Sequence, residues 1–192
     1  MEAKTNLTTI NAMNITNRKK SVSFPKAWAK CLADYPNGKG IYTADLGGDV
    51  VYDGTPVYLS SGICKVQKTA MVYENAGSSA TTYKIYKGSH LKVGDTVTNG
   101  STSYAITAMD KSNALYDTIT VGTTLGAATK DTTILVVGSN TVVGLVTGHH
   151  EVLEAGKNLE AGVGVIGTVK EANLKTPLTS TMKSALKGVV FI

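Results

Sequence analysis

The stretch "KVGDTVTNGSTSYAITAMDKSNALYDTITVGTTLG" (residues 92–126) has the pattern that decides the fold class. Short runs of Val, Ile, Tyr and Thr follow one another, and turn sequences such as "TNGST" and "DKSN" separate them. Alternation of apolar and polar residues places one face of a strand against a core. The Asn99-Gly100 pair supplies the positive φ that a tight hairpin turn needs. The stretch therefore predicts a small twisted sheet, a scaffold that presents loops and edges.

The same texture continues on both sides of this stretch. "TPVYLSSGICKVQ" (residues 55–67) reads as strand, turn and strand, and further short apolar runs follow at "TTILVVG" and "VGVIGTVK". Many short strands at regular spacing are typical of all-β proteins. We therefore expect a mainly β fold, with a small β-barrel or β-sandwich body over residues 41–169.

The N-terminal residues 1–40 predict an extended basic arm that contains one short helix. Within "FPKAWAKCLADYPNGKG" (residues 24–40), Pro25 suits a first helical position and "YPNGKG" ends the run. Trp28 and Leu32 are four residues apart, so a helix would place them on one buried face. Trp28 is the only tryptophan, and we expect it to anchor a core or an interface.

The C-terminal residues 170–192 predict a short helix followed by a terminal strand. Thr176 suits the N-cap, Pro177 the first helical position and Gly188 the stop. Leu178, Met182, Ala185 and Leu186 repeat at helical spacing and form one apolar face. The chain then ends in "VVFI", which we expect to add a strand to the β body of its own chain or of a symmetry mate.

The net charge of +5 arises entirely in the arm. The remaining chain carries twelve basic and twelve acidic residues, whereas residues 1–40 hold two acidic residues, Glu2 and Asp34, against Lys4, Arg18, Lys19, Lys20, Lys26, Lys30 and Lys39. A basic arm binds phosphate or an acidic protein surface, although a solvated tail that aids solubility explains the same charge.

The sequence contains no recognisable catalytic, cofactor or metal motif. His149 and His150 are adjacent, so on a strand they point to opposite faces, and no third ligand stands at metal-site spacing. No serine or cysteine lies in a GxSxG elbow. The glycines of "GVGVIG" (residues 162–167) lie among strand formers with no helix start after them, so we reject a dinucleotide loop. We expect a protein that is not an enzyme and needs no cofactor or metal.

Composition gives weaker indications of environment and binding. The N-terminal residues lack the apolar core of a secretion signal, no apolar run is long enough to cross a bilayer, and Cys31 and Cys64 suit free thiols. Nine tyrosines stand against two phenylalanines. Half-buried sheet positions account for this excess, and sugar binding and oligomer packing remain alternatives.

Three stretches resemble the small head-fibre and head-decoration proteins of tailed bacteriophages, including the auxiliary capsid proteins of crAss-like phages. They are "DGTPVYLSSGICKV" (residues 53–66), residues 91–126, and the ending "EAGVGVIGTVKEANLKTPLTSTMKSALKGVVFI" (residues 160–192). The resemblance implies a non-enzymatic virion protein, made in the host cytoplasm, that docks on the capsid exterior and bridges capsid subunits. Its implied partners are the major capsid protein, other head proteins and further copies of itself as a dimer or trimer, with no membrane.

Two other functions fit parts of the sequence. A lectin-like adhesin domain would bind host surface glycans with exposed tyrosines and loops. A small-barrel nucleic-acid binder fits less well, because the basic charge lies outside the β body, where a binding groove needs it. The residues we expect to contact partners are the basic and apolar ones near the two ends: Arg18, Lys19, Lys20, Trp28, Phe191 and Ile192.

Overall fold

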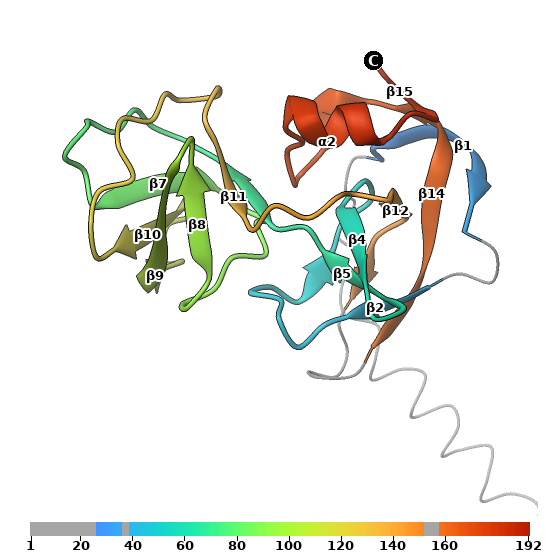
Figure 1. The fold of residues 1–192 in the computed structure, drawn as a ribbon, viewed down its shortest axis with the longest axis horizontal. Coiled ribbons are helices and arrows are strands. Elements are labelled where there is room, and N and C mark those ends of the chain that lie inside the picture. Colours follow the sequence, from blue (N-terminus) through green and yellow to red (C-terminus); the bar gives the residue numbers. More distant parts are fainter. Residues whose placement is uncertain (1–25, 36–38, 152–157) are drawn as a thin grey trace, which may run out of the picture.

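The computed structural model describes residues 26–35, 39–151 and 158–192, and the fold is mainly β, as the sequence predicts. Two β lobes lie side by side (Figure 1). The second lobe is formed by residues that lie in the chain between two strands of the first lobe. It is therefore an insertion into the first.

The first lobe has a seven-stranded sheet that closes on itself. Its strands are β1 (Trp28–Asp34), β2 (Lys39–Tyr42), β4 (Pro56–Ser60), β5 (Ile63–Val66), β12 (Gly144–Thr147), β14 (Leu159–Val169) and β15 (Val189–Phe191). The pairings run from β14 through β12, β4, β5 and β2 and back to β14, so they form a small barrel. Apolar side chains fill its interior, including Ile41, Val57, Val66, Val146 and Val163.

Strand β14 organises this lobe because it is long enough to serve four neighbours. On one edge it pairs with β1 and β2, and on the other with β12 and β15. All but one of these pairings are antiparallel, and the terminal strand β15 lies parallel to β14. The "VVFI" ending thus adds a strand to its own chain. A further antiparallel pair joins β3 (Val50–Val51) to β13 (His150–Glu151). In the chain, β3 lies between β2 and β4, and β13 lies between β12 and β14.

Residues 28–34 form strand β1, and the prediction of a helix there is wrong. The Trp28 indole lies against two glycines of β14: a Cβ at Gly164 would come within 2.4 Å of Trp28 Cζ2, and one at Gly167 within 2.9 Å of Cζ3. Pairing with β14 across this glycine surface overrides the local helix propensity of Ala, Lys and Leu. Leu32, expected to share the buried face with Trp28, is instead 64% exposed.

The second lobe is a six-stranded sheet that also closes. Its strands are β6 (Thr69–Met71), β7 (Thr82–Tyr86), β8 (Thr96–Asn99), β9 (Thr102–Asp110), β10 (Tyr116–Val121) and β11 (Ile134–Val137). They pair in the order β6, β11, β8, β9, β10, β7, and a bridge between Val72 and Ile85 joins the two ends. Residues 92–126, from which the fold class was predicted, supply the centre of this sheet.

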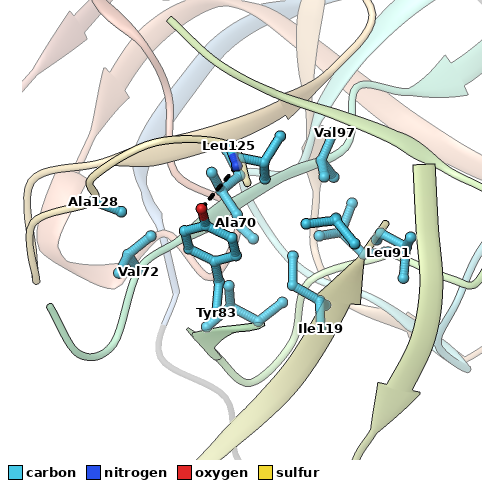
Figure 2. Packing of buried hydrophobic residues seen from close by; sticks show 12 residues of the cluster. Ala70, Val72, Tyr83, Leu91, Val97, Ile119, Leu125 and Ala128 are labelled. Carbon is cyan, nitrogen blue, oxygen red and sulfur yellow. Dashed lines mark hydrogen bonds between the residues drawn. The ribbon is translucent and has the colours of Figure 1, made fainter. Parts of the chain in front are cut away.

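Tyr83 lies inside the second lobe and connects its loops (Figure 2). Its hydroxyl accepts a hydrogen bond from the backbone N–H of Leu125 at 2.9 Å and lies 2.8 Å from Ala80 O and 2.9 Å from Gly126 O. A buried tyrosine hydroxyl needs such partners. Tyr83 therefore fixes the turn before β7 to the loop after β10.

The C-terminal segment folds as a 3-10 turn η1 (Glu171–Asn173), helix α2 (Ser180–Ala185) and β15. The helix begins one turn later than expected, because Thr179, not Thr176, is the N-cap, and its hydroxyl accepts from Met182 N at 3.3 Å. Three residues of the predicted apolar face, Leu178, Met182 and Leu186, are buried against Trp28, Val169 and their neighbours. The fourth, Ala185, is exposed at the end of the helix. Helix α2 thereby covers one end of the first barrel.

Candidate functional site

The outer surface of strands β14 and β15 carries large aliphatic side chains that are exposed to solvent. Along β14, Val163 and Val169 point into the lobe and Ile166, between them, is exposed. Val190 lies beside Thr168 in the β14–β15 register, and Val190 and Ile192 are both exposed. Together with Ile166, they form a group of exposed aliphatic side chains that we call the terminal face: Ile166, Val190 and Ile192. The exposed Lys30 of β1 lies beside this group, in register with Thr168. Large aliphatic side chains grouped in water are a candidate interaction site.

Both ends of the described chain meet at this face. Trp28 pairs with Val169, Lys170 N donates to Ala27 O at 2.7 Å, and Glu171 N donates to Ile192 O at 2.9 Å. The first described residue, Lys26, therefore lies close to the C-terminal strand. Arg18, Lys19 and Lys20, which the sequence marks for partner binding, lie outside the described residues.

The other three predicted contact residues occupy different environments. Trp28 is only 8% exposed; its Nε1 donates to Val146 O at 3.0 Å, and its backbone N donates to Asp53 Oδ2 at 2.9 Å. It is an interior residue that supports the terminal face from below. Phe191 is half-buried beneath the Lys183 ammonium, 5.9 Å from the ring centroid. Only Ile192 presents its side chain fully on the terminal face.

A second distinctive region is the junction between the lobes, which polar contacts hold together. Gly47 N donates to His90 O at 2.9 Å, and the Lys111 ammonium donates to Gly47 O. Lys92 Nζ donates to Ala44 O at 3.1 Å. A loop of the first lobe is thus held by two segments of the second, the connection between β7 and β8 and the connection after β9.

The Lys68–Asp95 ion pair lies buried in the same junction. Lys68 Nζ is 2.8 Å from both Asp95 carboxylate oxygens, and both side chains are almost fully buried. Desolvation lowers the pKa of Lys68, and the hydrogen bond and charge of Asp95 oppose that shift. Next to it, Gln67 Nε2 donates to Val137 O at 2.7 Å, which ties together the two chain segments that connect the lobes.

His90 is buried in the junction without a hydrogen bond from any described residue to either ring nitrogen. Burial lowers its pKa from 6.5 to about 4, and the positive charges of Lys68 and Lys111 act in the same direction. The folded protein therefore holds a neutral imidazole between pH 4 and 6.5, whereas the unfolded chain binds a proton there. Stability falls as the pH falls through this window.

We predict that His90→Leu removes this pH dependence. Between pH 7 and pH 5 the wild type should lose about 2 kcal/mol more stability than the variant, from the difference between the two His90 pKa values. Urea unfolding at the two pH values measures the loss. The exposed His149 gives the control, and His149→Leu should keep the wild-type loss. Equal losses in wild type and His90→Leu would contradict the buried neutral imidazole.

Clefts follow the line where the lobes meet. The larger, of about 690 Å³, lies between the second lobe and helix α2, with Ile134, Val136 and Met182 among its apolar lining and the hydroxyls of Thr98, Ser103 and Thr179 among its polar one. None of its lining residues is titratable, so it offers hydrogen bonds and apolar contact but no general acid or base. A smaller cleft, of about 340 Å³, opens between the second lobe and η1.

The residues that the sequence offers as metal ligands, phosphate-binding glycines or nucleophiles do not come together in one site. Within the described ranges, no three His, Cys, Asp or Glu side chains converge as a metal site would require. His150 Nε2 lies 2.9 Å from Thr147 O, and residues 162–167 lie inside β14 and not in a phosphate-binding loop. Burial raises the pKa of the Cys31 thiol, as does the nearby Asp34 carboxylate, which disfavours the reactive thiolate.

No helix among the described residues is both long and apolar enough to cross a bilayer. Comparisons of the chain with protein-family models, with curated proteins and with solved structures found no match.

Proposed function

We propose that this protein is a structural virion component that docks on the outer surface of a tailed-phage capsid through its terminal face, as a decoration or head-fibre base protein. The observation that carries the proposal is the group of exposed aliphatic side chains on β14 and at the C-terminal strand β15. The sequence resemblance to head-fibre and head-decoration proteins points to the same role. The partners proposed are the major capsid protein and other head proteins, with the protein itself a dimer or trimer.

The terminal face has the physical properties of a docking surface. Its aliphatic side chains project from a sheet whose backbone is fixed by pairing on both edges of β14. Covering them would remove apolar area from water, which is worth up to roughly 1.5–3 kcal/mol for each fully buried side chain. Because the face is preformed, little ordering entropy opposes binding.

Charge suggests the nature of the opposing surface. The net charge of +5 belongs to residues 1–40, and the first described residue, Lys26, lies close to the C-terminal strand. A complementary partner is therefore an acidic protein surface that contains an apolar patch. Binding energy that exists only in the assembled lattice stabilises that lattice, which is how a bridging protein strengthens a capsid.

The position of the terminal face fits this role. In Figure 1, β1 and β14 lie on the side of the first lobe that is remote from the second lobe. A protein held by this face would keep its second lobe in solvent. The inserted lobe is then free to contact further molecules.

We predict that the double variant Val190→Asp/Ile192→Asp loses at least tenfold in affinity for capsids assembled from the major capsid protein encoded with this chain. Charges in a desolvated apolar contact are strongly unfavourable. Co-sedimentation with capsids measures the affinity, and circular dichroism with thermal melting checks that the variant is folded.

Leu115→Asp is the matched control, because Leu115 in the second lobe is as exposed as Ile192, at 65%. It should bind capsids like the wild type. Deletion of residues 1–20 tests the basic arm separately and should also weaken binding. Unchanged co-sedimentation of the Val190/Ile192 variant would disprove docking by the terminal face. A different result would be a wild type that does not bind capsids and a double variant that no longer self-associates. That result would identify the terminal face as a contact between copies of this chain.

A glycan-binding adhesin is the second candidate function. The observation that favours it is a cleft between the lobes that is lined by Tyr86, one of three clustered tyrosines of the second lobe. This cleft does not depend on the terminal face.

A further inference from the structure

Three tyrosines cluster on the outer surface of the second lobe. Tyr86 of β7 and Tyr116 of β10 are direct partners across the two strands, and Tyr73 follows the bridge that closes the barrel. The ring centroids of Tyr73 and Tyr86 are 5.0 Å apart at 75°, and those of Tyr73 and Tyr116 are 5.1 Å apart at 31°. Aromatic rings at these separations support one another.

Polar partners fix the rings in place. The Tyr86 hydroxyl donates to Asp131 Oδ1 at 2.6 Å. The Lys84 ammonium lies 5.0 Å from the Tyr116 ring centroid and is 2.7 Å from Glu74 Oε2. The cluster is therefore ordered before any ligand arrives, which removes much of the entropy cost of binding.

Tyr86 also lines the cleft of about 340 Å³ between the lobes. This volume lies at the lower end of the range for small-molecule sites, and such sites favour the boundary between two domains. Apolar groups line much of the rest of the cleft: Met71, Ile134, Ala172, Leu174, Pro177 and Leu178. The cleft thus combines one aromatic ring with an apolar floor.

The charged groups of the cleft are of both signs, and most are already paired. Lys87 Nζ donates to Asp117 Oδ1 at 2.6 Å and to Lys111 O at 2.8 Å. Glu171 forms an ion pair with Lys183. An anion would meet the Glu171 carboxylate, and a cation would meet the ammonium groups of Lys87 and Lys175. The site therefore suits a ligand with no net charge that both donates and accepts hydrogen bonds.

We propose that this cleft, with Tyr86 as its aromatic platform, binds a neutral saccharide of one to three residues. A sugar ring has an apolar C–H face, which packs on an aromatic ring and on aliphatic side chains. Its edge carries hydroxyls, which donate to carboxylates and accept from ammonium groups. An apolar peptide would cover the same floor but would leave the surrounding charges desolvated without new partners. The proposal is independent of capsid docking.

The test is saturation-transfer NMR of the full-length protein with a defined panel of saccharides. The panel contains the methyl glycosides of glucose, galactose, mannose and N-acetylglucosamine, together with maltotriose, cellotriose and chitotriose, each at up to 10 mM. We expect at least one saccharide of the panel to receive saturation from the protein, and we expect the effect to be strongest at the C–H protons of its sugar ring. Tyr86→Ala should abolish that signal or weaken the affinity at least tenfold. Tyr86→Phe, which keeps the ring and loses the contact with Asp131, should retain most of it.

Tyr104→Ala is the matched control, because Tyr104 on β9 is as exposed as Tyr86, at 37%, and does not line the cleft. It should bind like the wild type. The proposal is overturned if no member of the panel binds, or if Tyr86→Ala and Tyr104→Ala bind equally well. Binding of the neutral apolar probe N-acetyl-leucinamide with no saccharide bound would assign the cleft to peptides and overturn it as well.

Discussion

Replacing Gly47 by alanine is expected to lower the free energy of unfolding by about 3 kcal/mol. A Cβ at this position would lie 1.9 Å from Leu91 O and 2.5 Å from Leu91 C, which are backbone atoms of the other lobe. No side-chain rotation relieves such a contact, so the backbone of the Gly47 loop or of the segment at Leu91 must shift. The hydrogen bond from Gly47 N to His90 O would weaken at the same time.

Gly48→Ala provides the control one residue away. Its added Cβ would meet no atom closer than His90 Nδ1, at 3.9 Å, which is ordinary van der Waals contact. Urea unfolding should therefore place Gly48→Ala close to the wild type and Gly47→Ala far below it. Limited proteolysis should cut the connecting segments of Gly47→Ala faster. Equal stability of the two variants would contradict the packing of the lobes described above.

The second large effect is expected at the buried ion pair of the junction. Lys68→Met should cost about 3–5 kcal/mol, because it leaves the Asp95 carboxylate buried without its counter-charge. Among the described residues, the Asp95 carboxylate would keep the hydrogen bond from Lys92 N, at 2.9 Å. Asp95→Asn should cost a comparable amount, because it strands the Lys68 ammonium in the same way.

The double variant Lys68→Met/Asp95→Leu separates the cost of an unpaired charge from the value of the pair. Since it leaves neither charge behind, it should be clearly more stable than Lys68→Met alone. Lys84→Met breaks the more exposed pair with Glu74 and should change the stability much less than Lys68→Met does, because solvent screens exposed charges. Unfolding free energies from denaturant titration give all these values. A double variant no more stable than Lys68→Met would refute this account.

The fold class was readable from the sequence because strand alternation and turn residues are local signals. Residues 92–126 show them plainly, and they form β8, β9 and β10 with their connections. The closure of two barrels was not readable, because it depends on pairings between distant segments, such as β2 with β14. The helix predicted at residues 28–34 failed for the same reason: the glycines of β14 that receive Trp28 lie more than a hundred residues away in the chain.

The candidate sites likewise include features that local sequence indicates and features that only the tertiary fold creates. The apolar ending "VVFI" indicated a sheet contact, and its pairing with β14 agrees with that. The tyrosine excess was visible, but the grouping of Tyr73, Tyr86 and Tyr116 needed the fold. Lys68 and His90 gave no signal, because burial of a charged or polar residue is a property of its tertiary surroundings. A lysine within the strand-like run "KVQKTAM" was the one available hint.

The insertion of one lobe into the other sets the order in which the chain can fold during synthesis. When β5 emerges from the ribosome, its lobe still lacks β12 and β14, and residues 69–137 must be translated before them. At about 5–20 residues per second, this takes roughly 3–14 s. The inserted barrel is contiguous and can fold within that interval, while β1, β2, β4 and β5 wait for their central strand. The half-built first barrel, with its unpaired edges, is therefore the stage of biogenesis most exposed to aggregation and to chaperones.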